Sequence, residues 1–116
     1  MSKNPNSVEE MTLEVVAAEA FTLLGFERRR GGKWYDPKSG THYKISLDTV
    51  AALMPEGWLF VVDNLGGLPG EREWRAGAWH HDDEAGPHDT INTTADTELL
   101  ARFRLLLLIL RKESNV

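Results

Sequence analysis

Histidine and carboxylate side chains concentrate in one short segment of this sequence of 116 residues. Imidazole and carboxylate groups bind zinc, manganese or iron where they converge on one point. A metal-dependent or hydrolytic enzyme built on residues 80–89 is therefore one alternative, with His80, His81, Asp82 and His88 as candidate ligands. The full run of histidines and acids in the segment is His80, His81, Asp82, Asp83, Glu84, His88 and Asp89.

The spacing of these residues argues against a preformed metal site. His80 and His81 point to opposite faces if a strand continues through them, and the segment lacks the i, i+4 spacing with which helical ligands converge. A solvated acidic turn explains the same residues without any metal. We therefore expect no cofactor.

Other catalytic signatures are missing from the sequence. The absence of cysteine excludes thiolate ligands, disulfides and cysteine nucleophiles, and it is typical of a reducing cytoplasm. The glycine-rich residues 65–70 lack the lysine and the following helix of a phosphate-binding loop. Ser7, Ser39, Ser46 and Ser114 have no nucleophile signature around them. We therefore expect a protein that is not an enzyme.

Charge is divided unequally along the chain. The whole sequence carries 13 basic and 18 acidic side chains, and this net charge of −5 disfavours general affinity for nucleic acid or anionic lipid. Residues 27–44 hold six basic against two acidic side chains, a net charge of +4. Residues 63–98 hold two basic against nine acidic side chains, a net charge of −7.

The basic hairpin, from Arg28 to Lys44, offers phosphate contacts, and its Trp34 and Tyr35 offer rings on which bases stack. A nucleic-acid-binding module is therefore a second alternative. Both aromatic residues also fit packing within a core, and we favour that use. Direct contact with nucleic acid is accordingly not expected.

The acidic region leads to the opposite interpretation. Closely spaced carboxylates on a small rigid domain complement a basic groove on a nucleic-acid-binding protein, and such complementarity speeds and orients association. We expect the affinity for such a partner to fall steeply with salt. The predicted partner-binding residues are Asp82, Asp83, Glu84, Asp89, Glu71, Glu73 and Trp79.

Hydrophobic periodicity and turn residues divide the chain into helices and short strands. Ser7 begins an S-x-x-E capping box and opens a predicted helix that stops at Gly25. Gly31 and Gly32 form the turn of a hairpin, since glycine readily takes the positive φ that such turns need. Further predicted elements are a strand at 41–46, a short helix capped by Asp48, strands at 58–62 and 73–81, and a last helix from Thr93 or Thr94 to Lys112.

Tryptophans and one apolar run mark the expected core. Trp74 and Trp79 lie five residues apart, so a regular strand sends them to opposite faces. With helices on only one side of the sheet, the outer tryptophan becomes an anchor for a partner or a second copy. Residues 105–110 are apolar on every side, which favours burial inside the fold and leaves a homodimer as the other alternative.

The length of the chain supports one core and no second one. We expect a single domain at residues 7–112, with flexible ends at 1–6 and 113–116. The longest apolar run is far shorter than the ~20 residues that cross a bilayer, so no membrane contact is expected. No targeting segment is evident, and the expected location is the cytoplasm.

Several short motifs follow one another in a distinctive order. They are Leu24-Gly25-Phe26, Lys33-Trp34-Tyr35-Asp36-Pro37, residues 46–52, Pro55-Glu56-Gly57-Trp58, Trp74-Arg75-Ala76 and a leucine-rich last helix. Over about residues 10–112 this order resembles the phage ABA sandwich domain, a family of small phage and prophage proteins. The resemblance implies an α/β/α sandwich and a phage or prophage origin, and it implies no catalytic residue.

We therefore predict a single α/β sandwich of the α+β type, with a small, mostly antiparallel sheet covered by the N- and C-terminal helices. We further expect a non-enzymatic phage accessory protein that binds a host protein in the bacterial cytoplasm. The resemblance and the acidic surface together favour inhibition of a host defence system such as CRISPR–Cas, that is, anti-CRISPR activity.

Overall fold

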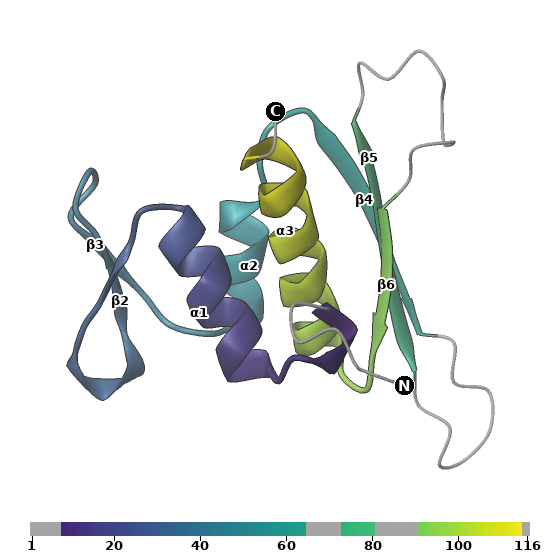
Figure 1. The fold of residues 1–116 in the computed structure, drawn as a ribbon, viewed down its shortest axis with the longest axis horizontal. Coiled ribbons are helices and arrows are strands. Elements are labelled where there is room, and N and C mark those ends of the chain that lie inside the picture. Colours follow the sequence, from purple (N-terminus) through teal and green to yellow (C-terminus); the bar gives the residue numbers. More distant parts are fainter. Residues whose placement is uncertain (1–7, 65–72, 81–90, 115–116) are drawn as a thin grey trace.

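A computed structural model of the chain describes residues 8–64, 73–80 and 91–114. These residues form the predicted α/β sandwich of helices and antiparallel strands (Figure 1). The layers differ from the expected single covered sheet. The described residues form two three-stranded sheets with the helices between them. We call the sheet within residues 27–43 the first sheet and the sheet within residues 58–95 the second sheet.

The N-terminal helix begins later than the capping box predicts. A 3-10 turn at Val8–Glu10 is followed by α1 at Leu13–Leu23. Thr12 caps α1, because its backbone is extended and its side-chain oxygen accepts a hydrogen bond from the backbone N–H of Val15 at 3.4 Å. The predicted cap, Ser7, lies outside the described residues.

The first sheet is built around the predicted glycine turn. Gly31 and Gly32 have φ of 79° and 74°, values that glycine adopts without the steric cost of a Cβ atom. Asp36 organises the next turn by accepting hydrogen bonds from Lys38 N at 2.9 Å and Ser39 Oγ at 2.8 Å. The strands are β1 at Glu27–Arg28, β2 at Trp34–Asp36 and β3 at Thr41–Tyr43.

Helix α2, at Leu47–Leu53, leads from the first sheet to the second. Its cap is Ser46 and not Asp48: Ser46 Oγ accepts a hydrogen bond from Thr49 N at 3.2 Å, and Asp48 occupies the first turn. Acidic residues are favourable in that position because the N-terminus of a helix carries partial positive charge.

The second sheet contains a strand whose last residues were predicted to begin the final helix. Its strands are β4 at Trp58–Asn64, β5 at Trp74–His80 and β6 at Ile91–Ala95. Thr93 and Thr94 lie in β6 opposite Ala76 and Arg75, so the prediction that the last helix begins there is wrong. The helix starts only at Glu98. The residue before it, Thr97, accepts a hydrogen bond on its Oγ1 from Leu100 N at 3.2 Å.

Helix α3, at Glu98–Ser114, is the centre of the fold (Figure 1). One side packs against α1 and α2, and the other packs against the second sheet. The fully buried α3 residues are Phe103, Leu106 and Leu107 on the first side and Ala101, Leu105 and Ile109 on the second. The predicted burial of this apolar run within the fold is therefore confirmed.

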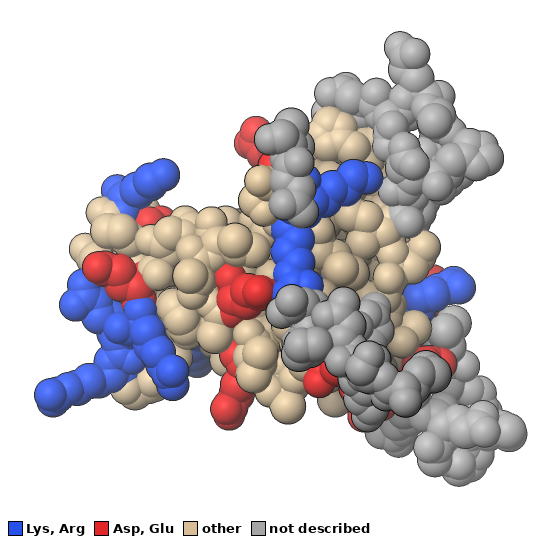
Figure 2. Space-filling view, viewed as in Figure 1, with Lys and Arg blue, Asp and Glu red and all other residues tan. Residues whose placement is uncertain are grey.

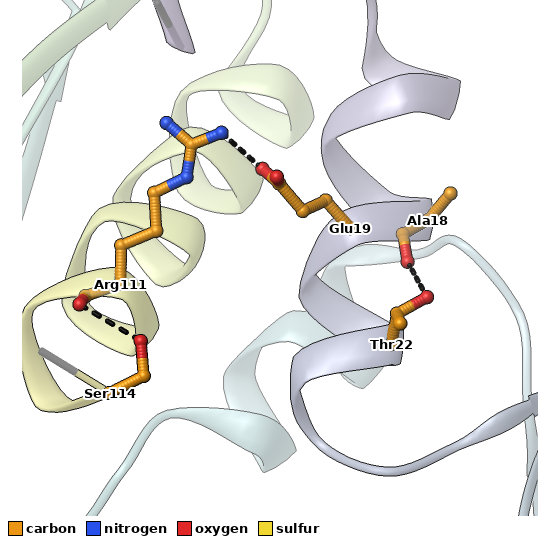
Figure 3. A network of polar contacts seen from close by, with 5 residues as sticks. All are labelled: Ala18, Glu19, Thr22, Arg111 and Ser114. Atoms are coloured by element: carbon orange, nitrogen blue, oxygen red, sulfur yellow. Dashed lines mark hydrogen bonds and ion pairs between the residues drawn. The ribbon is translucent and has the colours of Figure 1, made fainter. Parts of the chain in front are cut away.

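Two arginines of α3 tie it to other segments. The Arg111 guanidinium forms an ion pair with the Glu19 carboxylate on α1 (Figure 3). Arg104 donates hydrogen bonds to the carbonyl oxygens of Thr94 at 2.6 Å and Met11 at 3.0 Å. Among the described helices, none combines the length and hydropathy needed to cross a membrane.

Candidate functional site

The predicted metal and acidic residues lie mostly outside the described part of the chain. Those outside it are His81, Asp82, Asp83, Glu84, His88, Asp89 and Glu71. His80 is described: it ends β5 and is half-buried. Its ring lies edge-on to the Trp58 ring, with the two ring centroids 5.3 Å apart. Within residues 8–64, 73–80 and 91–114, no three metal-ligating side chains come together.

The remaining predicted contact residues, Glu73 and Trp79, belong to the second sheet. Glu73 is exposed immediately before β5. Trp79 lies opposite Leu59 of β4, on the sheet face that points away from α3, whereas Trp74 packs with the core beneath α3. The two tryptophans thus occupy opposite faces, as their spacing predicts, because side chains alternate along a strand.

Leu59, Val61 and Trp79 form a surface that we call the apolar face. Leu59 is 49% exposed and Val61 46% exposed, and Trp79 is half-buried. Val61 lies opposite Gly77, so β5 contributes no side chain there and the three apolar groups adjoin one another. At the next outward-facing pair, Arg75 and Asp63 form an ion pair at 3.5 Å.

Arg29, Arg30, Lys33, Tyr35, His42 and Lys44 form a second surface, which we call the basic face. It lies on the first sheet, where Figure 2 shows Lys and Arg side chains gathered at the left of the molecule. Tyr35 lies opposite His42 in the ladder, and their ring centroids are 4.9 Å apart. The Arg29 guanidinium lies 4.7 Å from the centre of the Tyr35 ring.

Two adjoining depressions open on the basic face. The larger, of about 600 Å³, is lined by Arg29, Arg30, Lys33, Tyr35 and His42. The smaller, of about 390 Å³, shares Lys33 and His42 with it. The other residues that line the smaller depression are Tyr43, Lys44, Ser46, Asp48 and Thr49.

The structure separates the two aromatic residues that the sequence analysis assigned to core packing. Trp34 is 8% exposed and its ring lies 5.1 Å from that of Phe21, so its packing role is confirmed. Tyr35 faces the other way and joins His42 and Arg29. Sequence reasoning gave the cations of this hairpin and Tyr35 as an alternative binding module but missed His42, although the alternation Lys33-x-Tyr35 and His42-x-Lys44 was a usable signal for one shared face.

The described serines support local backbone geometry. Ser39 Oγ donates to Asp36, Ser46 Oγ donates to Thr49 Oγ1, and Ser114 Oγ donates to the Arg111 carbonyl (Figure 3). The hydrogen bond from Ser39, followed by that from the Lys38 backbone, lowers the pKa of the Asp36 carboxyl below its ordinary value of 3.8.

The described chain thus offers one apolar face and one basic face, on the two sheets at opposite sides of the helices (Figure 1). Such surfaces act by binding: the first removes apolar area from water, and the second attracts anions. A scan of protein-family models and searches of curated proteins and of solved structures find no match to this chain.

Proposed function

We propose that this chain is a non-enzymatic binding protein whose apolar face docks on a protein partner. The observation that carries the proposal is the cluster of Leu59, Val61 and Trp79 on the sheet face that α3 does not cover. Contiguous apolar side chains on a small protein are typical of interaction sites. Tryptophan in particular is enriched among the residues that contribute most to binding.

Burial of this surface supplies a driving force for association. Fully burying a side chain such as Leu59 or Val61 contributes roughly 1.5–3 kcal/mol relative to leaving it exposed, and both are close to half exposed here. The backbone beneath them is fixed by the ladder between β4 and β5. A preformed strand surface loses little conformational entropy on binding, so more of this energy appears as affinity.

Charge around the second sheet favours a basic partner. Glu73 is exposed beside β5, and the chain segments 65–72 and 81–90, which connect the strands in sequence, hold five acidic residues against one arginine. A second copy of the chain carries the same excess of acidic residues, so the charges of two copies repel each other. A protein with an apolar centre and a basic rim is complementary in both respects.

The resemblance to small phage proteins adds a biological setting to this proposal. A nucleic-acid-binding component of a host defence system, such as a CRISPR–Cas nuclease, carries the basic groove that an acidic ligand requires. Occupation of that groove inhibits the host protein in proportion to the amount of ligand bound, without any catalytic step. The resemblance and the charge pattern support this inhibitor function.

The proposal is tested by comparing capture from a bacterial lysate by the wild-type chain and by Trp79→Ser and Leu59→Ser. We expect the wild type to retain a basic protein whose measured affinity falls steeply between about 50 and 200 mM salt. Trp79→Ser should weaken binding of the purified partner by about 30-fold or more, because a central tryptophan anchor contributes about 2 kcal/mol or more. Leu59→Ser should weaken it by about 5-fold or more, because only the exposed half of this side chain remains to be buried. Val15→Ser is the matched control, since Val15 is 51% exposed on α1.

Circular dichroism confirms that each variant is folded before affinities are compared. Equal capture by the wild type, Trp79→Ser and Val15→Ser overturns the proposal. Concentration-dependent dimerisation that Trp79→Ser abolishes also overturns it, because the occupant of the apolar face is then a second copy. Reversing Asp82, Asp83 and Glu84 to lysine tests the acidic contribution: unchanged affinity removes those residues from the interface.

A further inference from the structure

We propose that the basic face of the first sheet binds single-stranded nucleic acid, through stacking at Tyr35 and His42 and phosphate contacts from the surrounding cations. This site is separate from the apolar face, because the two lie on different sheets with the helices between them. This inference is therefore independent of the protein partner proposed above, and the two are tested separately.

The stacking part of the site is already assembled. Tyr35 and His42 are held side by side by the β2–β3 ladder, with ring centroids 4.9 Å apart. His42 is exposed, and the Arg29 guanidinium lies over Tyr35. Nucleic-acid bases stack both on aromatic rings and on guanidinium planes, and this stacking tolerates any base sequence.

The phosphate-binding part surrounds these rings. Arg29, Arg30 and Lys33 line the larger depression, and Lys33 and Lys44 line the smaller one. Glu27 lies on the same face, but Arg29 pairs with it at 3.0 Å. Because both partners of this pair are more than half exposed, the pair is weak and Arg29 is available to a phosphate.

The form of the surface favours a single strand over other anions. The two depressions are open and share Lys33 and His42, so together they form a continuous track rather than one closed pocket. A duplex keeps its bases stacked inside and leaves Tyr35 and His42 without a role. An acidic peptide pairs with the cations but has no planar bases to stack, and an anionic membrane likewise engages charge alone.

Fluorescence anisotropy with a labelled oligothymidylate is the direct test, with a duplex, polyglutamate and anionic vesicles as comparison ligands. We expect the single strand to bind most tightly. Its affinity should decrease with salt by about 0.7 logarithmic units per logarithmic unit for each phosphate contacted. His42→Ala should lower the affinity by about 5-fold or more, as loss of one stacking platform does.

A pair of double variants separates a specific face from general charge. Lys33→Gln with Lys44→Gln removes two cations from the basic face. Arg28→Gln with Lys38→Gln removes the same charge from the same hairpin, but Arg28 lies on the opposite sheet face beside Trp34 and Lys38 lines neither depression. We expect only the first pair to weaken binding strongly and to reduce the salt slope, by about 0.7 for each lysine.

Three results overturn the inference. Variants are compared only where they retain the circular dichroism of the wild type. The first is no binding of the oligothymidylate at low salt. The second is equal or tighter binding of the duplex, polyglutamate or vesicles. The third is an equal loss of affinity in the two double variants, which shows general electrostatic attraction and no defined site.

Discussion

At the scale of single residues, polar side chains in this protein mainly fix turns and join elements. Asp36 accepts two hydrogen bonds that shape the turn between β2 and β3. Arg104 links the start of the chain to β6, and Arg111 links α3 to α1. The residues with chemical interest, Tyr35 and His42, contribute ring surface instead of proton transfer to the function proposed for them.

Asp36 provides a prediction about pH. Because its pKa is lowered in the folded state, its carboxylate contributes stability above the pKa of the unfolded chain, and this contribution is lost as the pH falls through the lowered folded value. The hydrogen bond from Ser39 is the main cause. We therefore expect Ser39→Ala to raise the pKa of Asp36 toward 3.8, as measured by carboxyl NMR titration.

The control for this titration is Thr22→Ala. Thr22 donates a hydrogen bond to the Ala18 carbonyl within α1, outside the turn (Figure 3). It should leave the titration of Asp36 unchanged. An Asp36 pKa that is equally low in Ser39→Ala and in the wild type contradicts the assigned cause.

At the scale of elements, α3 packs against the second sheet on one side and against α1 and α2 on the other. Its apolar residues divide between two clusters, and the second sheet presents Ala76 and Ala78 beneath Leu105. Small residues on the strand let the helix approach closely, and the large residues of the helix fill the space between them. This complementarity explains why a helix of leucines is buried without a second copy of the chain.

Truncation of buried α3 side chains should therefore destabilise the fold on either side of the helix. We expect Leu105→Ala and Leu107→Ala each to lower the free energy of unfolding by about 2–5 kcal/mol, because each leaves a cavity in a fully buried cluster. Urea unfolding followed by circular dichroism measures the change. Val15→Ala, at a site 51% exposed, should change it by no more than about 0.5 kcal/mol. If either leucine substitution lowers the free energy of unfolding by no more than Val15→Ala does, the central position of α3 is contradicted.

At the scale of the whole molecule, two sheets share one helical layer. The first sheet contributes Trp34 to the cluster that includes Phe103, and the second sheet contributes Ala76 to the cluster that includes Leu105. Each sheet is small and gains its stability by packing on helices, since strand pairs alone are marginal in water. The shared helical layer predicts that the chain unfolds as one unit.

Coincident transitions are the test of this single unit. In the wild type, tryptophan fluorescence and far-ultraviolet circular dichroism should give the same urea midpoint. In Trp34→Phe, which keeps the tryptophans of the second sheet, these two probes should again agree with each other, whatever the stability of the variant. Loss of the Trp34 signal at a lower urea concentration than the helical signal contradicts the prediction, because the first sheet then unfolds by itself.

The sequence by itself determined features that depend on neighbouring residues. Gly31 and Gly32 specify the hairpin turn through their backbone freedom, and residues 105–110 specify a helix buried on several sides because the run is apolar all round. The unequal distribution of charge is likewise visible without coordinates. The candidate metal and acidic residues of 81–90 stay predictions, because they lie outside the described chain.

Only the tertiary structure decided which strand faces are exposed and which side chains meet on them. Thr93 and Thr94 pair with β5, and that pairing assigned them to a strand although their local sequence also fits a helix start. The apolar run at 58–62 predicts a strand but not which of its faces is covered, and Leu59 and Val61 are exposed because α3 covers the opposite face of their sheet. The physical reason is that strand pairing and burial depend on contacts between segments distant in sequence, whereas caps, turns and periodicity depend on neighbours along the chain.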